Sequence, residues 1–269
     1  MCLSCLSLIM NISTFQDLVG FDTATVCIVW TEIGNGGLDS MGQMIEARMA
    51  DGVSIRVYRA APKTPPRAGM VIMHEAFGMN AHIRDMCDRY AVEGYLTFSP
   101  ALYDRVDYGV EISGYSEVEL ELALKLRKSA DWEQSVSDMR STIEIAREAG
   151  PVGVVGYCWG GSLAWLAATR CGVDVAVSYY GGQIIQFIDE IPECPFLAHF
   201  AEHDVHVPPE SASILKEHHP TVPNYLYDAN HGFNCDQRSD YDAESAALAQ
   251  RRTSEFFADN LFNSVGGDS

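Results

Sequence analysis

A short glycine-rich run carries the strongest chemical signal in the sequence. It reads Gly156-Tyr157-Cys158-Trp159-Gly160-Gly161, follows the apolar stretch 152–155 and opens a helical pattern over 160–171. A strand, a sharp turn and a helix in this order form a nucleophile elbow, here with cysteine in place of serine. The glycines admit a strained backbone, and a helix N-terminus favours the thiolate. A small cysteine filling core space is the other interpretation, but this context favours a nucleophile.

A nucleophile elbow requires an acid and then a histidine, each just after a later strand. Asp204 follows the apolar run 196–200, and His231 follows the run 225–227. His231 is expected to take the proton of Cys158, and Asp204 to orient the imidazole. Taken singly, Asp204 could be a turn residue and His231 an exposed loop histidine. Their chain order and placement together predict a Cys-Asp-His triad.

The loop 74–80 follows the apolar run 70–73 and contains Glu75. In elbow hydrolases this loop supplies one oxyanion-hole amide, and the residue after the nucleophile supplies the other. The backbone amides of Ala76 and Trp159 are therefore the expected oxyanion hole. Glu75 could hold the thiol proton at rest, so that the thiolate forms only when substrate displaces it. The alternative is a loop glutamate paired with an arginine, either Arg84 or Arg105.

The sequence indicates neither a metal site nor a disulfide framework. His203 and His206 flank the predicted acid, but no third ligand has a suitable spacing, so no metal is expected. The eight cysteines are irregularly spaced along the 269 residues, with no pair of CxxC units. A reducing, cytoplasmic compartment fits this usage.

Composition and charge narrow the class of partner. The chain is 47% hydrophobic and 20% charged, as ordinary globular proteins are. Its 18 Lys+Arg against 37 Asp+Glu give a net charge of −19, which repels phosphate backbones and anionic lipid. We therefore expect no nucleic acid and no membrane as partners. The expected partner is a small molecule, bound by a monomer or homodimer.

Strand-like and helix-like segments alternate along the chain, which predicts a three-layer α/β fold with a mostly parallel, doubly wound sheet. Asp51-Gly52 predicts a hairpin in front of this sheet, between 45–50 and 53–60. The predicted strands are 70–73, 95–98, 152–155, 173–178, 196–200 and 225–227. The predicted helices are 81–93, 116–128, 133–149, 160–171, 209–219 and 240–262.

The first forty residues do not match this pattern. Residues 1–40 have no sustained hydrophobic period and contain no Lys or Arg, so they lack the charged leader of a secretory signal. Residues 1–40 are either a small extra element packed on the domain or a dispensable tail; we favour the tail and interpret 41–269 as one domain. The helix over 116–128 is expected to cover the carboxyl edge of the sheet.

Six blocks of the sequence together resemble the dienelactone hydrolase (carboxymethylenebutenolidase) family. They are HEAFGMN, SPALYDR, GYCWGG, SYYGG, AEHDVHVP and ANHGF. The resemblance implies a cofactor-free α/β-hydrolase fold and the site residues Cys158, His231, Asp204 and Glu75. It also implies that Arg105 binds a substrate carboxylate. Further expected substrate contacts are Phe77, Tyr103 and Trp132.

One position departs from the family pattern. The family has a second carboxylate-binding arginine four residues after the triad histidine, and this chain has Cys235 there. Arg238 lies three residues later, and whether it reaches the substrate stays open. An arginine–carboxylate fork is a strong contact, so we expect dienelactone to be a poor substrate and small neutral esters to be accepted. The predicted function is cysteine-dependent hydrolysis of lactones or small carboxylic esters through an acyl-enzyme. The alternatives are a thioesterase or acyltransferase on the same fold, or a non-catalytic small-molecule binding protein.

Overall fold

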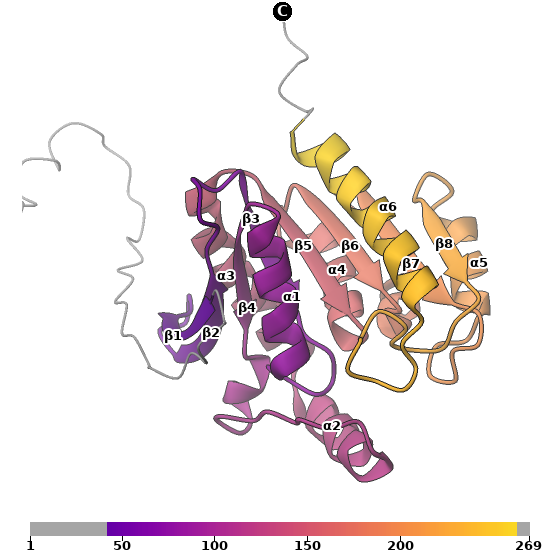
Figure 1. Cartoon of the computed structure of the whole chain (residues 1–269), viewed down its shortest axis with the longest axis horizontal. Coiled ribbons are helices and arrows are strands. Elements are labelled where there is room, and N and C mark those ends of the chain that lie inside the picture. The colour runs from indigo at the N-terminus through magenta and orange to yellow at the C-terminus, as the bar shows by residue number, and fades with distance from the viewer. Residues whose placement is uncertain (1–41, 263–269) are drawn as a thin grey trace, which may run out of the picture.

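A mostly parallel sheet of eight strands runs through the middle of the computed structural model, which describes residues 42–262 (Figure 1). Its strand order is β1-β2-β4-β3-β5-β6-β7-β8. The pairs β1–β2 and β2–β4 are antiparallel, and every other neighbouring pair is parallel. The strands are β1 (Gly42–Arg48), β2 (Ser54–Ala60), β3 (Ala68–Met73), β4 (Tyr95–Pro100), β5 (Val152–Tyr157), β6 (Val175–Tyr179), β7 (Phe196–Ala201) and β8 (Asn224–Tyr227).

The first two strands form the predicted hairpin. Gly52 adopts a left-handed φ of 85°, which glycine reaches without strain. The Asp51 Oδ1 atom accepts a hydrogen bond from the Val53 amide at 3.1 Å and so closes the turn. The resulting register pairs Ile45 with Val57, which places two buried apolar side chains in the same core.

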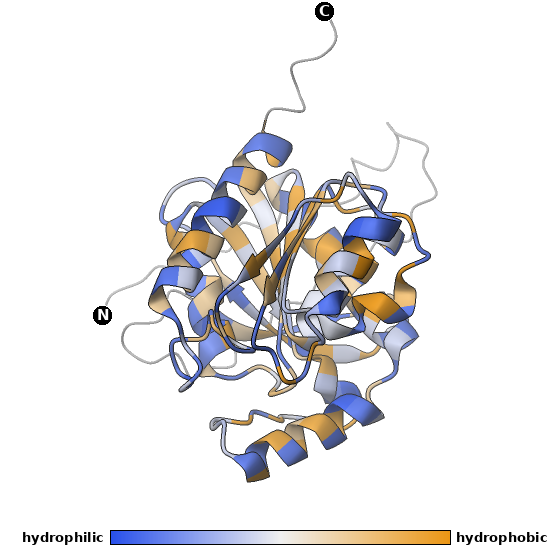
Figure 2. Cartoon of the chain, turned by 90° about the vertical axis from the view of Figure 1, so that its right-hand side faces the viewer, coloured by the Kyte–Doolittle hydropathy of each residue, from blue (hydrophilic) through white to orange (hydrophobic). Residues whose placement is uncertain are grey.

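Helices cover both faces of the sheet. The longer helices are α1 (Ala81–Val92), α2 (Glu117–Ser129), α3 (Trp132–Ala146), α4 (Trp159–Arg170), α5 (Glu210–His218) and α6 (Ala243–Leu261). Helices α1 and α6 share one apolar core, while α3, α4 and α5 share the other (Figure 1). The apolar residues concentrate on the strands and on the helix faces toward them (Figure 2). This is the predicted three-layer α/β-hydrolase fold.

Side-chain caps fix where several helices begin. Asn80 Oδ1 accepts from the Ile83 amide, Asp131 Oδ1 from the Gln134 amide, and Asp242 Oδ1 from the Ser245 amide. Helix α2 has a full capping box, because Ser116 and Glu119 each bind the other's backbone amide. Caps of this kind satisfy amides that have no partner within the helix. The polar residues between strands therefore set the starts of the helices.

Helix α2 projects from the carboxyl end of the sheet (Figure 1). Three of its apolar side chains are exposed: Val118, Leu122 and Leu124. Its buried residue Ala123 packs with Ala76, Phe77 and Ile112 in a small separate cluster. The predicted helix over 116–128 thus lies beside the loop that carries the expected oxyanion amide.

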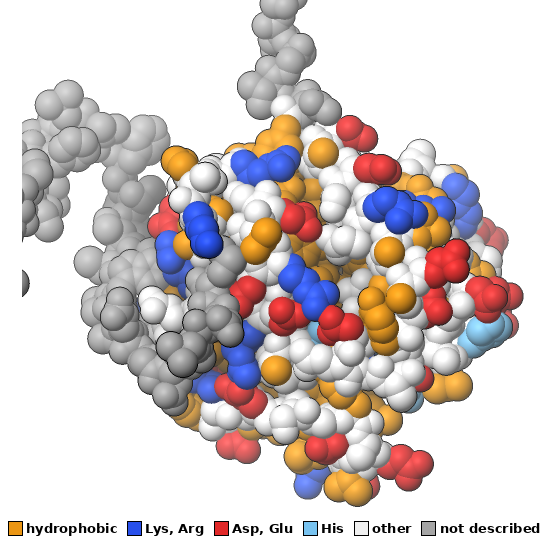
Figure 3. Space-filling view, in the orientation of Figure 1, with side chains coloured by type: hydrophobic (Ala, Val, Ile, Leu, Met, Phe, Trp, Pro, Cys, Tyr) orange, Lys and Arg blue, Asp and Glu red, His pale blue; other side chains and the backbone are white. Residues whose placement is uncertain are grey.

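The outer face of α1 and α6 mixes acidic and basic side chains (Figure 3). Within residues 42–262, no helix has the length and apolarity needed to cross a membrane. The predicted tail over 1–40 lies outside the described residues. Two short 3-10 helices, Leu102–Arg105 and Gly182–Phe187, were not predicted from the sequence.

Candidate active site

Cys158 occupies the sharp turn between β5 and α4. Its φ of 56° and ψ of −115° lie outside the regions that side-chain-bearing residues prefer, which is the strain of an elbow. The Cys158 amide donates to the Tyr179 carbonyl at 3.0 Å, and the Cys158 carbonyl accepts from the Gly161 amide at 2.9 Å. These bonds tie the turn to β6 and to the first turn of α4. The thiol is half-buried at the helix N-terminus.

Two glycines allow the strand and the helix to meet at this turn. A Cβ at Gly156 would lie 1.8 Å from the Gly160 carbonyl oxygen, and a Cβ at Gly160 would lie 2.1 Å from the Met73 carbonyl oxygen. Both obstacles are backbone atoms, which cannot move aside as a flexible side chain does. The glycines of the GYCWGG block therefore set the close approach of β3, β5 and α4.

The structure brings the predicted acid and base together. His231 Nδ1 lies 2.6 Å from Asp204 Oδ2, and both side chains are almost wholly buried. The other carboxylate oxygen of Asp204 accepts from the amides of His206 and Val207, at 2.7 and 2.8 Å. The turn geometry that was the alternative interpretation of Asp204 thus coexists with the contact to His231. These backbone bonds fix the carboxylate that orients the imidazole.

Electrostatics favour the charged form of His231. Burial lowers its pKa, but the negative charge of Cys158 and hydrogen bonds to Asp204 and Cys158 outweigh burial and raise the pKa to about 10. An imidazolium beside a thiolate is the ion pair that activates cysteine nucleophiles. The arrangement therefore keeps a proton on His231 at neutral pH, where it can serve as the general acid.

The loop after β3 presents backbone amides toward the same place. His74 Nδ1 lies 2.6 Å from the Glu75 carbonyl oxygen, and the Tyr103 hydroxyl donates to the Ala76 carbonyl at 2.8 Å. These contacts hold the loop in position. The amides of Ala76 and Trp159 donate no hydrogen bond within residues 42–262, and both residues line the cavity around Cys158. The pair can accept the developing charge of a tetrahedral intermediate.

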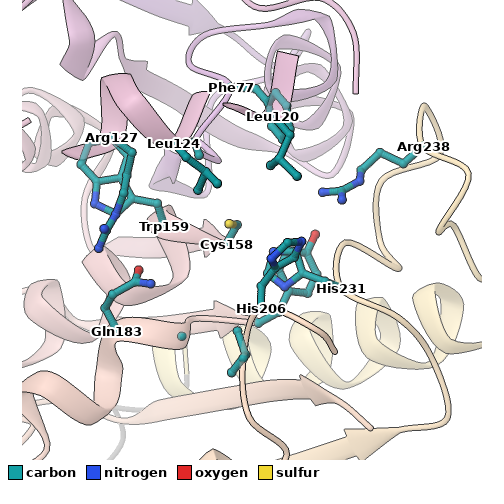
Figure 4. Close-up of a pocket in the computed structure, with 14 residues that line it drawn as sticks. Phe77, Leu120, Leu124, Arg127, Cys158, Trp159, Gln183, His206, His231 and Arg238 are labelled. Carbon is teal, nitrogen blue, oxygen red and sulfur yellow. The ribbon is translucent and has the colours of Figure 1, made fainter. Parts of the chain in front are cut away.

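A cavity of about 160 Å³ surrounds the thiol (Figure 4). One group of its lining residues belongs to the predicted site: Ala76, Phe77, Cys158, Trp159 and His231. A second group was not predicted to face it: Leu120, Leu124, Arg127, Tyr180, Gly182, Gln183, His206, Val207 and Arg238. Its walls are largely apolar, with an arginine at each side in Figure 4.

Glu75 is wholly buried, and Arg238 is the cation nearest to it. Arg238 Nη1 lies 3.6 Å from Glu75 Oε1, and the Arg238 side chain is only 8% exposed. The two carboxylate oxygens of Glu75 accept no hydrogen bond from any described residue. Burial lowers the pKa of Arg238, but the charge of Glu75, together with smaller contributions from Tyr180, Cys158 and Asp240, outweighs burial and raises the pKa. Glu75 therefore pairs with neither Arg84 nor Arg105, which were the alternatives.

Three of the expected substrate contacts do not line the cavity. Arg105 donates to Asp138 and to Asp51, the second of which is on the β1–β2 hairpin. Tyr103 stacks on Trp159 with ring centroids 5.4 Å apart. Trp132 packs edge-on against the same indole, at 6.1 Å. Tyr103 and Trp132 thus support the wall residue Trp159 from behind, and of the four expected contacts only Phe77 lines the cavity.

Comparisons with known proteins identify the family of the chain. The sequence profile of the dienelactone hydrolase family matches residues 55–261. The chain belongs to the dienelactone hydrolase family. It is 34% identical over 228 residues to the carboxymethylenebutenolidase of Pseudomonas putida, covering 78% of this chain and 97% of that protein. It is 31% identical over 223 residues to carboxymethylenebutenolidase 1 of Cupriavidus pinatubonensis, covering 80% of this chain and 95% of that protein.

Solved structures of this family and fold are also similar. A "Putative Dienelactone Hydrolase" from Klebsiella pneumoniae superposes with a TM-score of 0.71 at 26% identity, covering 79% of this chain and 97% of that one. An esterase from Pyrococcus furiosus superposes with a TM-score of 0.57 at 13% identity, covering 84% of this chain and 96% of that one. The second likeness concerns the fold alone. The protein is a hydrolase of this family.

Cys235, which stands where the family has a substrate-binding arginine, does not line the cavity. Cys235 is buried, and its thiol lies 3.4 Å from the Tyr115 hydroxyl. Burial and the charge of Glu75 raise the pKa of Cys235 to about 12, so the thiol is neutral at physiological pH. Arg238, three residues further on, lines the cavity that Cys235 does not reach.

Glu75, His82 and Cys235 form a buried group that could hold a metal ion, since their donor atoms lie within 4.8 Å of one another. Both ring nitrogens of His82 lack a described partner. However, the guanidinium of Arg238, 3.6 Å from Glu75, places a positive charge against the same carboxylate. That charge opposes a second cation, so the donor set does not favour a metal.

Sequence reasoning missed the contribution of α2. Leu120, Leu124 and Arg127 are spaced i, i+4 and i+7, so they share one face of the helix. That spacing was a readable signal for a helix with one face on a cavity. The sequence does not show which cavity this face of α2 lines, because no local pattern indicates how a protruding helix packs against the rest of the protein.

Proposed function

We propose that the protein is a cysteine-dependent hydrolase of small carboxylic esters and lactones. One observation carries the proposal: Cys158, His231 and two unbonded backbone amides face the same cavity, and Asp204 binds the far side of the imidazole. Family membership supports the reaction class. The triad assignment rests on the geometry of these residues.

The reaction follows from the positions of these groups. The Cys158 thiolate attacks the ester carbonyl, and the amides of Ala76 and Trp159 bind the oxyanion. His231 then donates its proton to the departing oxygen, which leaves an acyl group on Cys158. Water attacks the thioester with His231 as the base. Release of the acid regenerates the reactive pair of thiolate and imidazolium, from which the proton can return to the thiol.

Glu75 and Arg238 govern the resting state and the choice of substrate. We propose that Glu75 holds the thiol proton before substrate binds, which requires the Cys158 thiol to turn toward it, because neither oxygen of Glu75 accepts a hydrogen bond from Cys158 or any other described residue. Arg238 balances Glu75 at rest and offers an anchor to a substrate carboxylate at the cavity wall. We assign this anchor to Arg238 and not to Arg105, because Asp138 and Asp51 already occupy the Arg105 guanidinium. A carboxylate-bearing lactone is therefore a better candidate substrate than Cys235 alone suggested.

Burst kinetics with a chromogenic aryl ester test the proposal. We expect a burst equal to the enzyme concentration, and an acyl adduct that mass spectrometry maps to Cys158. Cys158→Ala is expected to abolish both. Cys194→Ala is the matched control, because Cys194 is half-buried and does not line the cavity. Wild-type turnover by Cys158→Ala would falsify the proposal, and a burst without turnover in water would indicate acyl transfer to another acceptor.

A further inference from the structure

The cavity wall opposite Arg238 carries a second cation. Arg127 lies in the last turn of α2 and faces the cavity with Leu120 and Leu124. In Figure 4, Arg127 and Arg238 lie on opposite sides of Cys158. Helix α2 therefore presents two leucines and one arginine to the nucleophile.

No carboxylate neutralises Arg127. None of the ion pairs within residues 42–262 includes it, although the chain has 37 Asp+Glu. Its guanidinium instead packs over the ring of Trp132, 5.5 Å from the centroid. Stacking uses the flat face of a guanidinium and leaves the N–H donors at its edge. Those donors are available to an anion in the cavity.

Gln183 adds a fixed amide on the same side of Cys158 as Arg127 (Figure 4). Its Oε1 accepts from the Ser162 hydroxyl at 3.2 Å, and its backbone amide donates to that hydroxyl at 2.9 Å. The amide NH₂ group donates no hydrogen bond to any described residue, so it is free for a ligand. A guanidinium and an amide donor together fit the two oxygens of a carboxylate.

The position of His231 indicates whether Arg127 and Arg238 each lie beside the acyl chain or beside the leaving group of a bound ester. His231 must protonate the departing oxygen, so the leaving group lies on its side. A Cβ at the next residue, Gly232, would lie 2.6 Å from Arg238 Nη1, which places Arg238 on the leaving-group side. Arg127 and Gln183 therefore lie toward the acyl chain.

We propose that Arg127, with Gln183, forms an acyl-side carboxylate subsite, and that the preferred substrates are hemiesters of short dicarboxylic acids. This rests on the proposed esterase function. Water adds across the ester bond and releases a dicarboxylate and an alcohol. A chain of charge −19 repels such anions in bulk. Local cations inside the cavity are what allow one to bind.

Monophenyl glutarate and its neutral counterpart phenyl pentanoate test the subsite. The measured quantity is the ratio of kcat/KM for the acidic ester to kcat/KM for the neutral one. We expect Arg127→Gln to lower this ratio about ten- to hundredfold, chiefly through KM of the acidic ester. Arg127→Lys keeps the charge and is expected to retain part of the preference. Lys128→Gln is the matched control, since Lys128 is the next residue of α2, is exposed and does not line the cavity.

The outcomes separate the subsite from the reaction. An unchanged ratio in Arg127→Gln, or an equal loss for both esters, reduces Arg127 to a structural contact of Trp132 and overturns the inference. Cys158→Ala is the independent arm. If it hydrolyses both esters like wild type, the esterase function fails. If hydrolysis depends on Cys158 but the ratio of the two kcat/KM values is the same in wild type and Arg127→Gln, only the proposed subsite is contradicted.

Discussion

Arg238 Nη1 lies 3.6 Å from Glu75 Oε1, at the boundary between the cavity and the protein interior. Arg238 also lies over the rings of Phe77 and Tyr115, 5.8 and 5.3 Å from their centroids. The arginine thus contacts a buried carboxylate and faces the space a substrate enters. If Arg238 anchors a substrate carboxylate as proposed, that carboxylate would compete with Glu75 for the guanidinium, and anion binding would be coupled to release of Glu75.

Glu75→Gln is expected to lower kcat while leaving the fold intact, because glutamine has nearly the same shape and cannot accept the thiol proton. The check is kcat across the pH range together with the melting temperature. Glu111→Gln, a change at a partly exposed carboxylate paired with Arg84, is the control. If kcat of the variant equalled that of wild type at every pH, Glu75 would not accept the thiol proton and would serve only as the counter-charge of Arg238.

Arg105→Gln is expected to destabilise the protein without changing substrate preference. Its loss leaves the Asp138 carboxylate, whose side chain is 0% exposed, without a cation. Removing one partner of a buried pair typically costs about 3 kcal/mol or more. Urea unfolding measures the loss, and Arg140→Gln on the exposed side of α3 is the comparison. If KM rose only for carboxylate-bearing esters and stability were unchanged, Arg105 would be the residue that binds the substrate carboxylate.

The charge on His231 is expected to set the alkaline limit of the enzyme. Burial lowers the pKa of His231, but Cys158 and Asp204 raise it to about 10, above the value of about 6.5 in an unfolded chain. We expect kcat/KM to fall as pH rises through about 10. The sign for stability is the same: the contribution of His231 is complete below about pH 6.5 and is lost as pH rises through the folded pKa.

Cys158→Ala provides the check on that pH dependence. Because Cys158 is the largest cause that raises the pKa of His231, its removal should lower that pKa. The titration of His231 by NMR in wild type and variant measures the difference. Identical titration curves would show that Cys158 has no charge to contribute.

Gly156→Ala is expected to abolish activity and to lower stability by several kcal/mol, more than ordinary overpacking of about 1–3 kcal/mol. The added Cβ would lie 1.8 Å from a backbone carbonyl oxygen. Gly153→Ala in the same strand is the matched control, since its Cβ would meet the ends of the Met70 and Phe257 side chains at 3.0 and 3.1 Å. Equal melting temperatures for the two variants would contradict this account of the elbow.

The regular elements were predictable because their signals are local. Six apolar runs and the Asp51-Gly52 turn predicted strands that the structure confirms, with ends that differ by a few residues. The 3-10 helix Leu102–Arg105 was missed because four residues are too few to show a period. The elbow and its partners were predictable because the fold imposes their chain order.

The long cationic side chains were not predictable in the same way. Arg105 and Asp138 are 33 residues apart, and no sequence pattern shows that they meet. Arg238 is seven residues after His231, a spacing that does not by itself show whether its side chain reaches the cavity. It reaches the cavity because the loop after β8 turns at Gly232, with a φ of 81°, and folds back over Phe77. Burial of charge depends on such loops, which local patterns do not describe.

The fold holds the residues proposed for the reaction on different segments from the two arginines proposed for substrate choice. Cys158 is held by a backbone bond to β6, and Asp204 by the amides of His206 and Val207, so in the proposed reaction a change at either residue is expected to abolish hydrolysis. Arg127 projects from a helix that protrudes between β4 and α3, and Arg238 from the loop between β8 and α6. Mutations in these two segments can retune the charge preference while hydrolysis continues. A few substitutions at the rim of this one cavity could therefore change which acids and alcohols the enzyme accepts during evolution.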